Sequence, residues 1–208
     1  MTKNIEKKGS ILSSKKQYSI QDLRAKLFDE NKGTTLDKIN SFTKFSGRQN
    51  IAKLLAQYEI FNLTKGVTGD IIEGGVYFGS GLFGWANIAV SREPFNYQCK
   101  ILGFDTFEDG FANIQLTDYD IDIKGQKAKF SDDGLPKEFY PTTEIVKKNI
   151  QDFLKTKIEN VVLIKGDVHK TLKNTKNIPE KISFLRLDTD SYSTTKLQLE
   201  ILFPKLVS

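Results

Sequence analysis

Two hydrophobic segments of the sequence end in glycines or in an acid, and this pattern is typical of nucleoside-binding sites. Residues 70–76 predict a buried strand that runs into a glycine-rich turn, and residues 100–106 predict a second strand that ends near Asp105. A carboxylate at the end of the second strand can accept hydrogen bonds from both hydroxyls of a ribose. A ligand can approach the backbone closely where no Cβ stands in its way, and four glycines offer this: Gly74, Gly75, Gly79 and Gly81. The pattern predicts a nucleoside cofactor, either a dinucleotide or S-adenosylmethionine.

The two cofactors differ in charge, and the turn contains an acid. Residues 79–84 read Gly-Ser-Gly-Leu-Phe-Gly, a G-x-G-x-x-G match with Asp105 about 20 residues later, as in dinucleotide-binding proteins. In those proteins the pyrophosphate rests on the helix that follows the turn. Here Glu73 lies at the start of the turn, where it would repel a pyrophosphate but attract the ammonium and sulfonium groups of S-adenosylmethionine. Local chemistry favours S-adenosylmethionine, with a nicotinamide-dependent oxidoreductase as the alternative.

A second group of acids follows a hydrophobic strand expected at 182–188. Asp188 and Asp190 are two residues apart, and such residues point the same way in an extended segment. Hard oxygen ligands of this kind suit Mg²⁺, and one of the acids is also a candidate general base. Alternatively, Asp190 and Ser193 only cap the helix that follows. Capping explains one of these residues but not two neighbouring acids.

The remaining pattern predicts an α/β protein with a parallel sheet, because strands and helices alternate from residue 70 onward. The long connection 108–141 carries many acids and aromatic residues, and we interpret it as a substrate lid or an insertion. Strands are expected at 70–76, 100–106, 161–166 and 182–188, and helices at 20–31, 46–64, 80–91, 142–156 and 194–203.

Three segments are expected along the chain: a flexible basic arm at 1–18, an N-terminal helical segment at 19–66, and a cofactor-binding domain at 67–208. A sheet of four parallel strands leaves an exposed edge. We therefore expect C-terminal strands to be missing, with the sequence cut where another strand should begin. A chain cut there would bind the cofactor weakly and show no turnover, and this makes a non-catalytic remnant that binds cofactor or partner proteins a further alternative.

Composition narrows the class of protein. Hydrophobic residues make up 38% of the 208 residues and charged residues 27%, as in soluble globular domains, and no apolar run is long enough to span a membrane. The single Cys99 fits a cytoplasmic protein. The net charge of +5 comes from scattered lysines, which argues against nucleic acid as a partner. The single His169 without cysteine or histidine companions argues against zinc.

Together, several segments resemble the macrocin O-methyltransferase family, whose members are S-adenosylmethionine- and Mg²⁺-dependent enzymes that methylate sugar hydroxyls. The resemblance extends from about Arg48 to Leu206. It rests on Arg48, residues 69–76 with Gly79, residues 103–107, Gly166-Asp167 and residues 187–195. It implies a Rossmann-like class I methyltransferase fold, with a parallel-rich sheet flanked by helices and with N-terminal helices. It also implies a small-molecule sugar substrate, a nucleotide-linked sugar or a glycoside, and leaves a homo-oligomer open.

The resemblance assigns roles to individual residues. Glu73 and Gly75 would line the methionine part of the cofactor, Asp105 would bind the ribose, and Asp167 would lie near the adenine. Asp188 would ligate Mg²⁺, with a further acidic pair that the family carries beyond the end of this sequence. Asp190 would take the proton from the attacking sugar hydroxyl. The complete set of expected cofactor contacts is Glu73, Gly74, Gly75, Gly79, Ser80, Asp105, Thr106, Asp167 and Asp188.

Overall fold

The computed structural model describes residues 15–96, 98–107 and 160–207. The chain forms two compact units, Met1–Leu55 and Ala56–Ser208, and the division falls inside helix α4 (Arg48–Leu63). The sequence predicts a boundary between 66 and 67 instead, where this helix has already ended. The expected lid at 108–141 and the expected helix at 142–156 lie outside the described residues.

The first unit contains three helices before α4: α1 (Lys15–Glu30), α2 (Thr35–Asn40) and α3 (Phe42–Phe45). The Thr34 hydroxyl accepts from the Asp37 N–H at 3.2 Å, and the Asp37 carboxylate accepts from the Thr34 N–H at 2.9 Å. This reciprocal pair is a capping box that starts α2. The sequence predicts only one helix here, at 20–31, and α1 also includes residues 15–18 of the expected arm.

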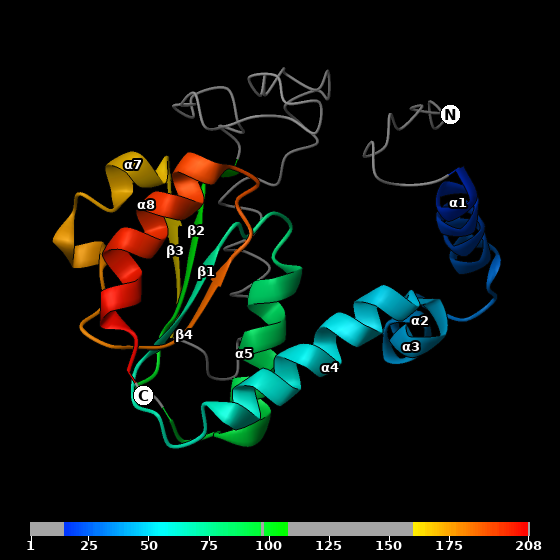
Figure 1. Ribbon diagram of the computed structural model, residues 1–208. Coiled ribbons are helices and arrows are strands. Elements are labelled where there is room, and N and C mark those ends of the chain that lie inside the picture. Colours follow the sequence, from blue (N-terminus) through cyan, green and yellow to red (C-terminus); the bar gives the residue numbers. More distant parts are fainter. Residues whose placement is uncertain (1–14, 97, 108–159, 208) are drawn as a thin grey trace. The chain divides into compact units, whose positions relative to one another are not determined.

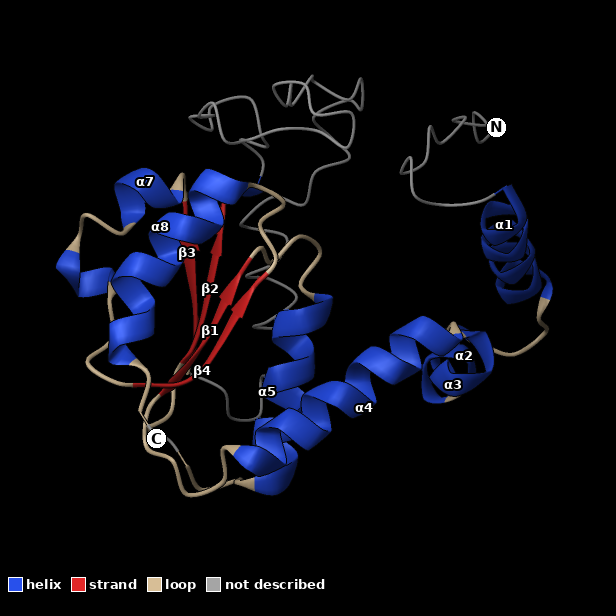
Figure 2. Ribbon diagram, viewed as in Figure 1, coloured by secondary structure: helices blue, strands red, loops and turns tan. Residues whose placement is uncertain are grey.

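The second unit is built on a parallel sheet of strands β1 (Asp70–Gly74), β2 (Ile101–Asp105), β3 (Val161–Lys165) and β4 (Ile182–Leu187). Their order is β3-β2-β1-β4, and every neighbouring pair is parallel. Figures 1 and 2 show the four strands side by side. The direction of strand succession reverses between β1 and β4, and ligands bind outside the carboxyl ends of the strands at such a reversal.

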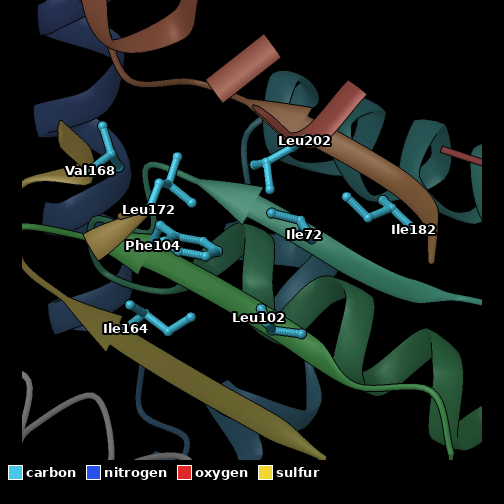
Figure 3. Close-up of a cluster of buried hydrophobic side chains, with 8 residues drawn as sticks. All are labelled: Ile72, Leu102, Phe104, Ile164, Val168, Leu172, Ile182 and Leu202. Atoms are coloured by element: carbon cyan, nitrogen blue, oxygen red, sulfur yellow. The ribbon is translucent and has the colours of Figure 1, made fainter. Parts of the chain in front are cut away.

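Helices cover both faces of this sheet (Figure 1). One face contacts α5 (Ser80–Arg92), and there the Trp85 ring packs on Phe184 with centroids 4.6 Å apart. The other face lies beneath α7 (Val168–Thr171) and α8 (Tyr192–Leu202). Figure 3 shows the buried cluster on that side, formed by Ile72, Leu102, Phe104, Ile164, Val168, Leu172, Ile182 and Leu202. Two short 3-10 turns complete the described elements, at Thr175–Asn177 and Phe203–Lys205.

Strand β4 contains one extra residue near its start. Asp70 pairs with Ile182, but the next residue of β1, Ile71, pairs with Phe184, so Ser183 has no partner in the register. The Ser183 hydroxyl donates to the Gly69 carbonyl at 3.1 Å. A Cβ at Gly69 would lie 2.7 Å from the Ser183 nitrogen, so glycine is needed there. Because of this bulge, Ile182 and Leu185 both pack on the α8 side, whereas Phe184 faces α5.

The four expected strands are confirmed within two residues at each end, as are the helices expected at 46–64, 80–91 and 194–203. After α8 the chain returns to β4, where Leu206 forms a parallel bridge with Ile182 and the Val207 N–H donates to the Ile182 carbonyl at 3.0 Å. In the described residues no helix has the length and apolar character needed to cross a bilayer.

Candidate active site

Asp105, at the end of β2, organises the glycine-rich turn that follows β1. Its Oδ2 accepts from the backbone N–H groups of Val76 and Tyr77, both at 2.7 Å. Its Oδ1 accepts from the Phe107 N–H at 2.8 Å. Tyr77 and Phe107 both have φ of +51°, which side-chain-bearing residues rarely adopt. The carboxylate therefore holds two strained turns together at the carboxyl edge of the sheet.

This arrangement bears on the ribose-binding role predicted for Asp105. A carboxylate can accept about four hydrogen bonds. The Asp105 carboxylate already accepts three from backbone N–H groups, and the Thr106 hydroxyl lies 3.5 Å from its Oδ1. Asp105 therefore shapes the turn whether or not a ligand is bound. A direct hydrogen bond from a ribose hydroxyl to Asp105 stays a prediction. Oδ1 is the oxygen that could accept it, because it accepts only one backbone N–H whereas Oδ2 accepts two.

The turn also contacts the acidic end of β4. Gly75 has φ of +87°, and a Cβ at this position would overlap the carbonyl oxygen of Asp188. The Asp188 N–H donates to the Gly74 carbonyl at 2.8 Å. On the opposite side of β1, Gly74 leaves room for the buried Gln198 amide of α8. The structure thus brings together two sets of residues that the sequence predicts separately, the glycine turn and the strand-end acids.

Glu73 lies deeper than the sequence suggests. Its side chain is 1% exposed, and its Oε1 lies 3.0 Å from the Arg186 Nη1. A Cβ at Gly81 of α5 would overlap the Glu73 carboxyl group, so α5 covers it closely. The other guanidinium nitrogen of Arg186 binds the Asp188 carboxylate. Sequence reasoning missed Arg186, although a lone charged residue inside the apolar segment 182–187 is a signal that it needs a partner.

Asp190 departs from the extended geometry that the sequence argument assumed. Strand β4 ends at Leu187, and Asp190 has φ of +55°. The helix cap is Ser191, whose hydroxyl accepts from the Thr194 N–H at 3.4 Å, so the capping alternative for Asp190 and Ser193 is wrong. The pKa of Asp190 is raised above its usual value, first by desolvation and then by the negative charge of Asp188. The two acids therefore do interact, through a turn rather than along a strand.

The other predicted residues lie along the same carboxyl edge. Gly79 is the N-cap of α5 with φ of +84°, and Ser80 is the first residue of that helix. Asp167 caps α7, and its Oδ1 accepts from the His169 N–H at 2.9 Å. The Gly166 N–H donates to the Asp105 carbonyl at 2.9 Å, which joins the ends of β2 and β3. The placement agrees with a cofactor that extends across several strand ends.

The expected Mg²⁺ must be tested against the residues present. No group of three or more histidine, cysteine, aspartate or glutamate side chains suited to a metal occurs among the described residues. Asp188 and Asp190 nevertheless offer hard carboxylate oxygens, and the charge of the first raises the pKa of the second. Since Mg²⁺ commonly takes one or two protein carboxylates and keeps several waters, this donor pair fits it.

A parallel sheet in this order, with a glycine turn and strand-end acids at its reversal point, agrees with the class I methyltransferase fold. The sequence matches the macrocin O-methyltransferase (TylF) family over residues 2–208. The chain belongs to this family and is an O-methyltransferase. A comparison with curated proteins found no match.

The solved structures that are similar to this chain include two of CalS11. A crystal structure of CalS11, a calicheamicin methyltransferase, shares 25% identity with a TM-score of 0.72 and covers 94% of this chain and 76% of that chain. The apo structure of CalS11, described as a TDP-rhamnose 3'-O-methyltransferase of calicheamicin biosynthesis, shares 25% identity with a TM-score of 0.65 and covers 94% and 75%. Both similarities cover most of the two chains.

Asp105→Ala should weaken the binding of S-adenosylhomocysteine by about 10- to 100-fold, since hydrogen bonds to a charged group contribute about 1.5–3 kcal/mol. The variant loses the acceptor that holds the Val76, Tyr77 and Phe107 N–H groups. Asp70→Ala is the matched control, because Asp70 accepts from the Lys100 N–H at 2.8 Å at the opposite edge of the sheet. Calorimetry that finds equal affinities for both variants would remove Asp105 from the cofactor site.

Proposed function

We propose that this O-methyltransferase transfers the methyl group of S-adenosylmethionine to a sugar hydroxyl with the help of Mg²⁺. The observation that carries the proposal is the direct contact between the glycine turn and the acidic strand end, where Gly75 packs on the Asp188 carbonyl. A donor held on the turn lies beside carboxylates suited to an acceptor hydroxyl. CalS11, described as acting on TDP-rhamnose, supports a nucleotide-linked sugar as the acceptor class.

The protein's own residues supply positioning and proton transfer. The turn clamped by Asp105 binds the donor, and Glu73, with Arg186 beside it, lies beneath this turn. Asp190 would accept the proton of the acceptor hydroxyl, and bound S-adenosylmethionine would supply the activated methyl group and be released as S-adenosylhomocysteine. Asp188 would hold the metal, with Asp190 beside it. When bound, Mg²⁺ lowers the pKa of a coordinated hydroxyl and orients it. Holding donor and acceptor together contributes much of the rate, since the methyl group is already activated.

The alternative of a nicotinamide-dependent oxidoreductase loses its support. The family match assigns methyl transfer. The strand-end acids Asp188 and Asp190 would also have no role in hydride transfer.

The proposal is tested by ligand binding followed by turnover. Calorimetry should show binding of S-adenosylhomocysteine and none of NAD. With labelled S-adenosylmethionine, Mg²⁺ and a panel of nucleoside-diphosphate sugars, one acceptor should gain a mass of one methyl group at a sugar oxygen. Transfer to simple catechols but to no sugar in the panel would overturn the acceptor class. Binding of NAD in place of S-adenosylhomocysteine would overturn the cofactor.

A further inference from the structure

One guanidinium group bridges two acids of different strands beneath the candidate site. Arg186 on β4 binds Glu73 of β1 with Nη1 and Asp188 with Nη2. The side chains become more exposed along this series, with 1% for Glu73, 21% for Arg186 and 57% for Asp188. The series therefore runs from the interior of the domain to the edge where the acceptor would bind.

The sheet register produces this arrangement. Glu73 and Arg186 are direct partners in the β1–β4 pairing, so their side chains leave the sheet on the same face. Asp188 follows two residues later, just beyond the end of β4. On that face α5 covers Glu73, because Gly81 leaves no room for a Cβ. The anchoring end of the series is thus enclosed by β1, β4 and α5.

We propose that Arg186 is a positioning residue that fixes the Asp188 carboxylate in its working orientation, with the buried Glu73 as its anchor. The inference rests on the proposed function, because it assigns Asp188 to the acceptor side of the site. A planar guanidinium suits this task, since its fixed fork binds two carboxylates at once, whereas an ammonium is a single point charge.

A simpler role must be separated from this one. A buried carboxylate needs a compensating charge, so Arg186 is also required to neutralise Glu73, and its removal alone leaves an uncompensated charge that destabilises the fold strongly. Loss of activity in a single Arg186 variant would therefore decide nothing. Replacing both members of a buried ion pair is often neutral for stability, and this permits a cleaner comparison.

The decisive pair is Glu73→Gln and the double variant Glu73→Gln with Arg186→Gln. Both variants lack the buried carboxylate, and only the first retains the guanidinium that binds Asp188. Arg186 keeps Asp188 as a partner in Glu73→Gln, so we expect both variants to fold, with similar affinities for S-adenosylhomocysteine and similar KM values for the donor. We expect kcat of the double variant to be at least tenfold lower than that of Glu73→Gln. Equal kcat values would show that Arg186 only neutralises Glu73.

A second measurement does not depend on turnover. Crystal structures of the same two variants should show the Asp188 carboxylate in its present place in Glu73→Gln and displaced in the double variant. An unmoved Asp188 in the double variant would overturn the proposal. If the wild-type chain transfers no methyl group to any sugar, the proposed function fails, but the crystal structures still decide whether Arg186 positions Asp188.

Arg186→Lys provides an independent check in the otherwise unchanged protein. Lysine keeps a positive charge beside Glu73, so the folded domain and the donor affinity should persist. A lysine cannot bridge both carboxylates in the same geometry. The kcat of Arg186→Lys should therefore fall below that of the wild-type protein by about the factor that separates the double variant from Glu73→Gln. Full activity of Arg186→Lys would argue for charge alone and against positioning.

Discussion

Asp190→Asn should lower kcat by about 10²- to 10⁴-fold while leaving the affinity for S-adenosylhomocysteine unchanged, as expected for removal of a general base. The amide keeps the size of the side chain but cannot accept the proton of the attacking hydroxyl. Asp190 stands in a turn with φ of +55°, and asparagine tolerates this conformation well. The fold should therefore survive the change. Single-turnover kinetics with labelled donor measure the chemical step directly.

The pH dependence gives a second readout for Asp190. The deprotonated carboxylate is the active base, and its pKa is raised above the usual value, chiefly by desolvation. The acidic limb of kcat should therefore lie at higher pH than an ordinary aspartate would give, and it should vanish in Asp190→Asn. Asp29→Asn on the exposed part of α1 is the control and should change neither quantity. An unaltered kcat in Asp190→Asn would assign proton transfer to another group.

Asp188→Asn should abolish the stimulation of turnover by Mg²⁺ and leave donor affinity nearly intact. The carboxylate is the proposed metal ligand, whereas the donor is proposed to bind on the turn that Asp105 holds. Asparagine can still accept a hydrogen bond from Arg186, so the local geometry should change little. A readout without turnover is the melting temperature, because a ligand that binds only the folded state stabilises it. Mg²⁺ should raise the melting temperature of the wild-type protein and not that of the variant.

Chelation provides the counterpart of this substitution. EDTA should reduce wild-type turnover to the level of Asp188→Asn, and added Mg²⁺ should restore it. Full turnover in EDTA would show that the metal proposal is wrong. The donor site would be untouched by that result, because its assignment rests on the turn and on Asp105.

Some parts of the fold follow from local sequence and others do not. Strands β1 to β4 are short apolar runs bounded by glycine or acids, and this pattern indicates buried parallel strands. Helices α2 and α3 have six and four residues and no extended apolar periodicity, so the pattern did not predict them. The signal for α2 was the cap at Thr34 with Asp37, in which aspartate takes the place of the usual glutamate.

The candidate site divides in the same way. The carboxyl ends of parallel strands meet at one edge, so the strand-end positions of Asp105, Asp167 and Asp188 were predictable from the order of elements. The partners of the side chains were not. The hydrogen bonds that Asp105 accepts from backbone N–H groups depend on the positive φ of Tyr77 and Phe107. The pairing of Glu73 with Arg186 depends on the register of β4. Both are properties of the assembled sheet.

The unpaired Ser183 gives that register a consequence for insertions and deletions. If Ser183 were paired and no bulge formed, continuous pairing from Asp70 and Ile182 would set Leu185, not Arg186, beside Glu73. A one-residue slip moves every following side chain to the opposite face, so a buried carboxylate would meet a leucine and a guanidinium would enter the apolar layer under α8. The ion pair near the carboxyl end of β4 therefore depends on the bulge at the start of the strand, whereas deletion of Ser183 itself would remove the bulge and keep Arg186 opposite Glu73.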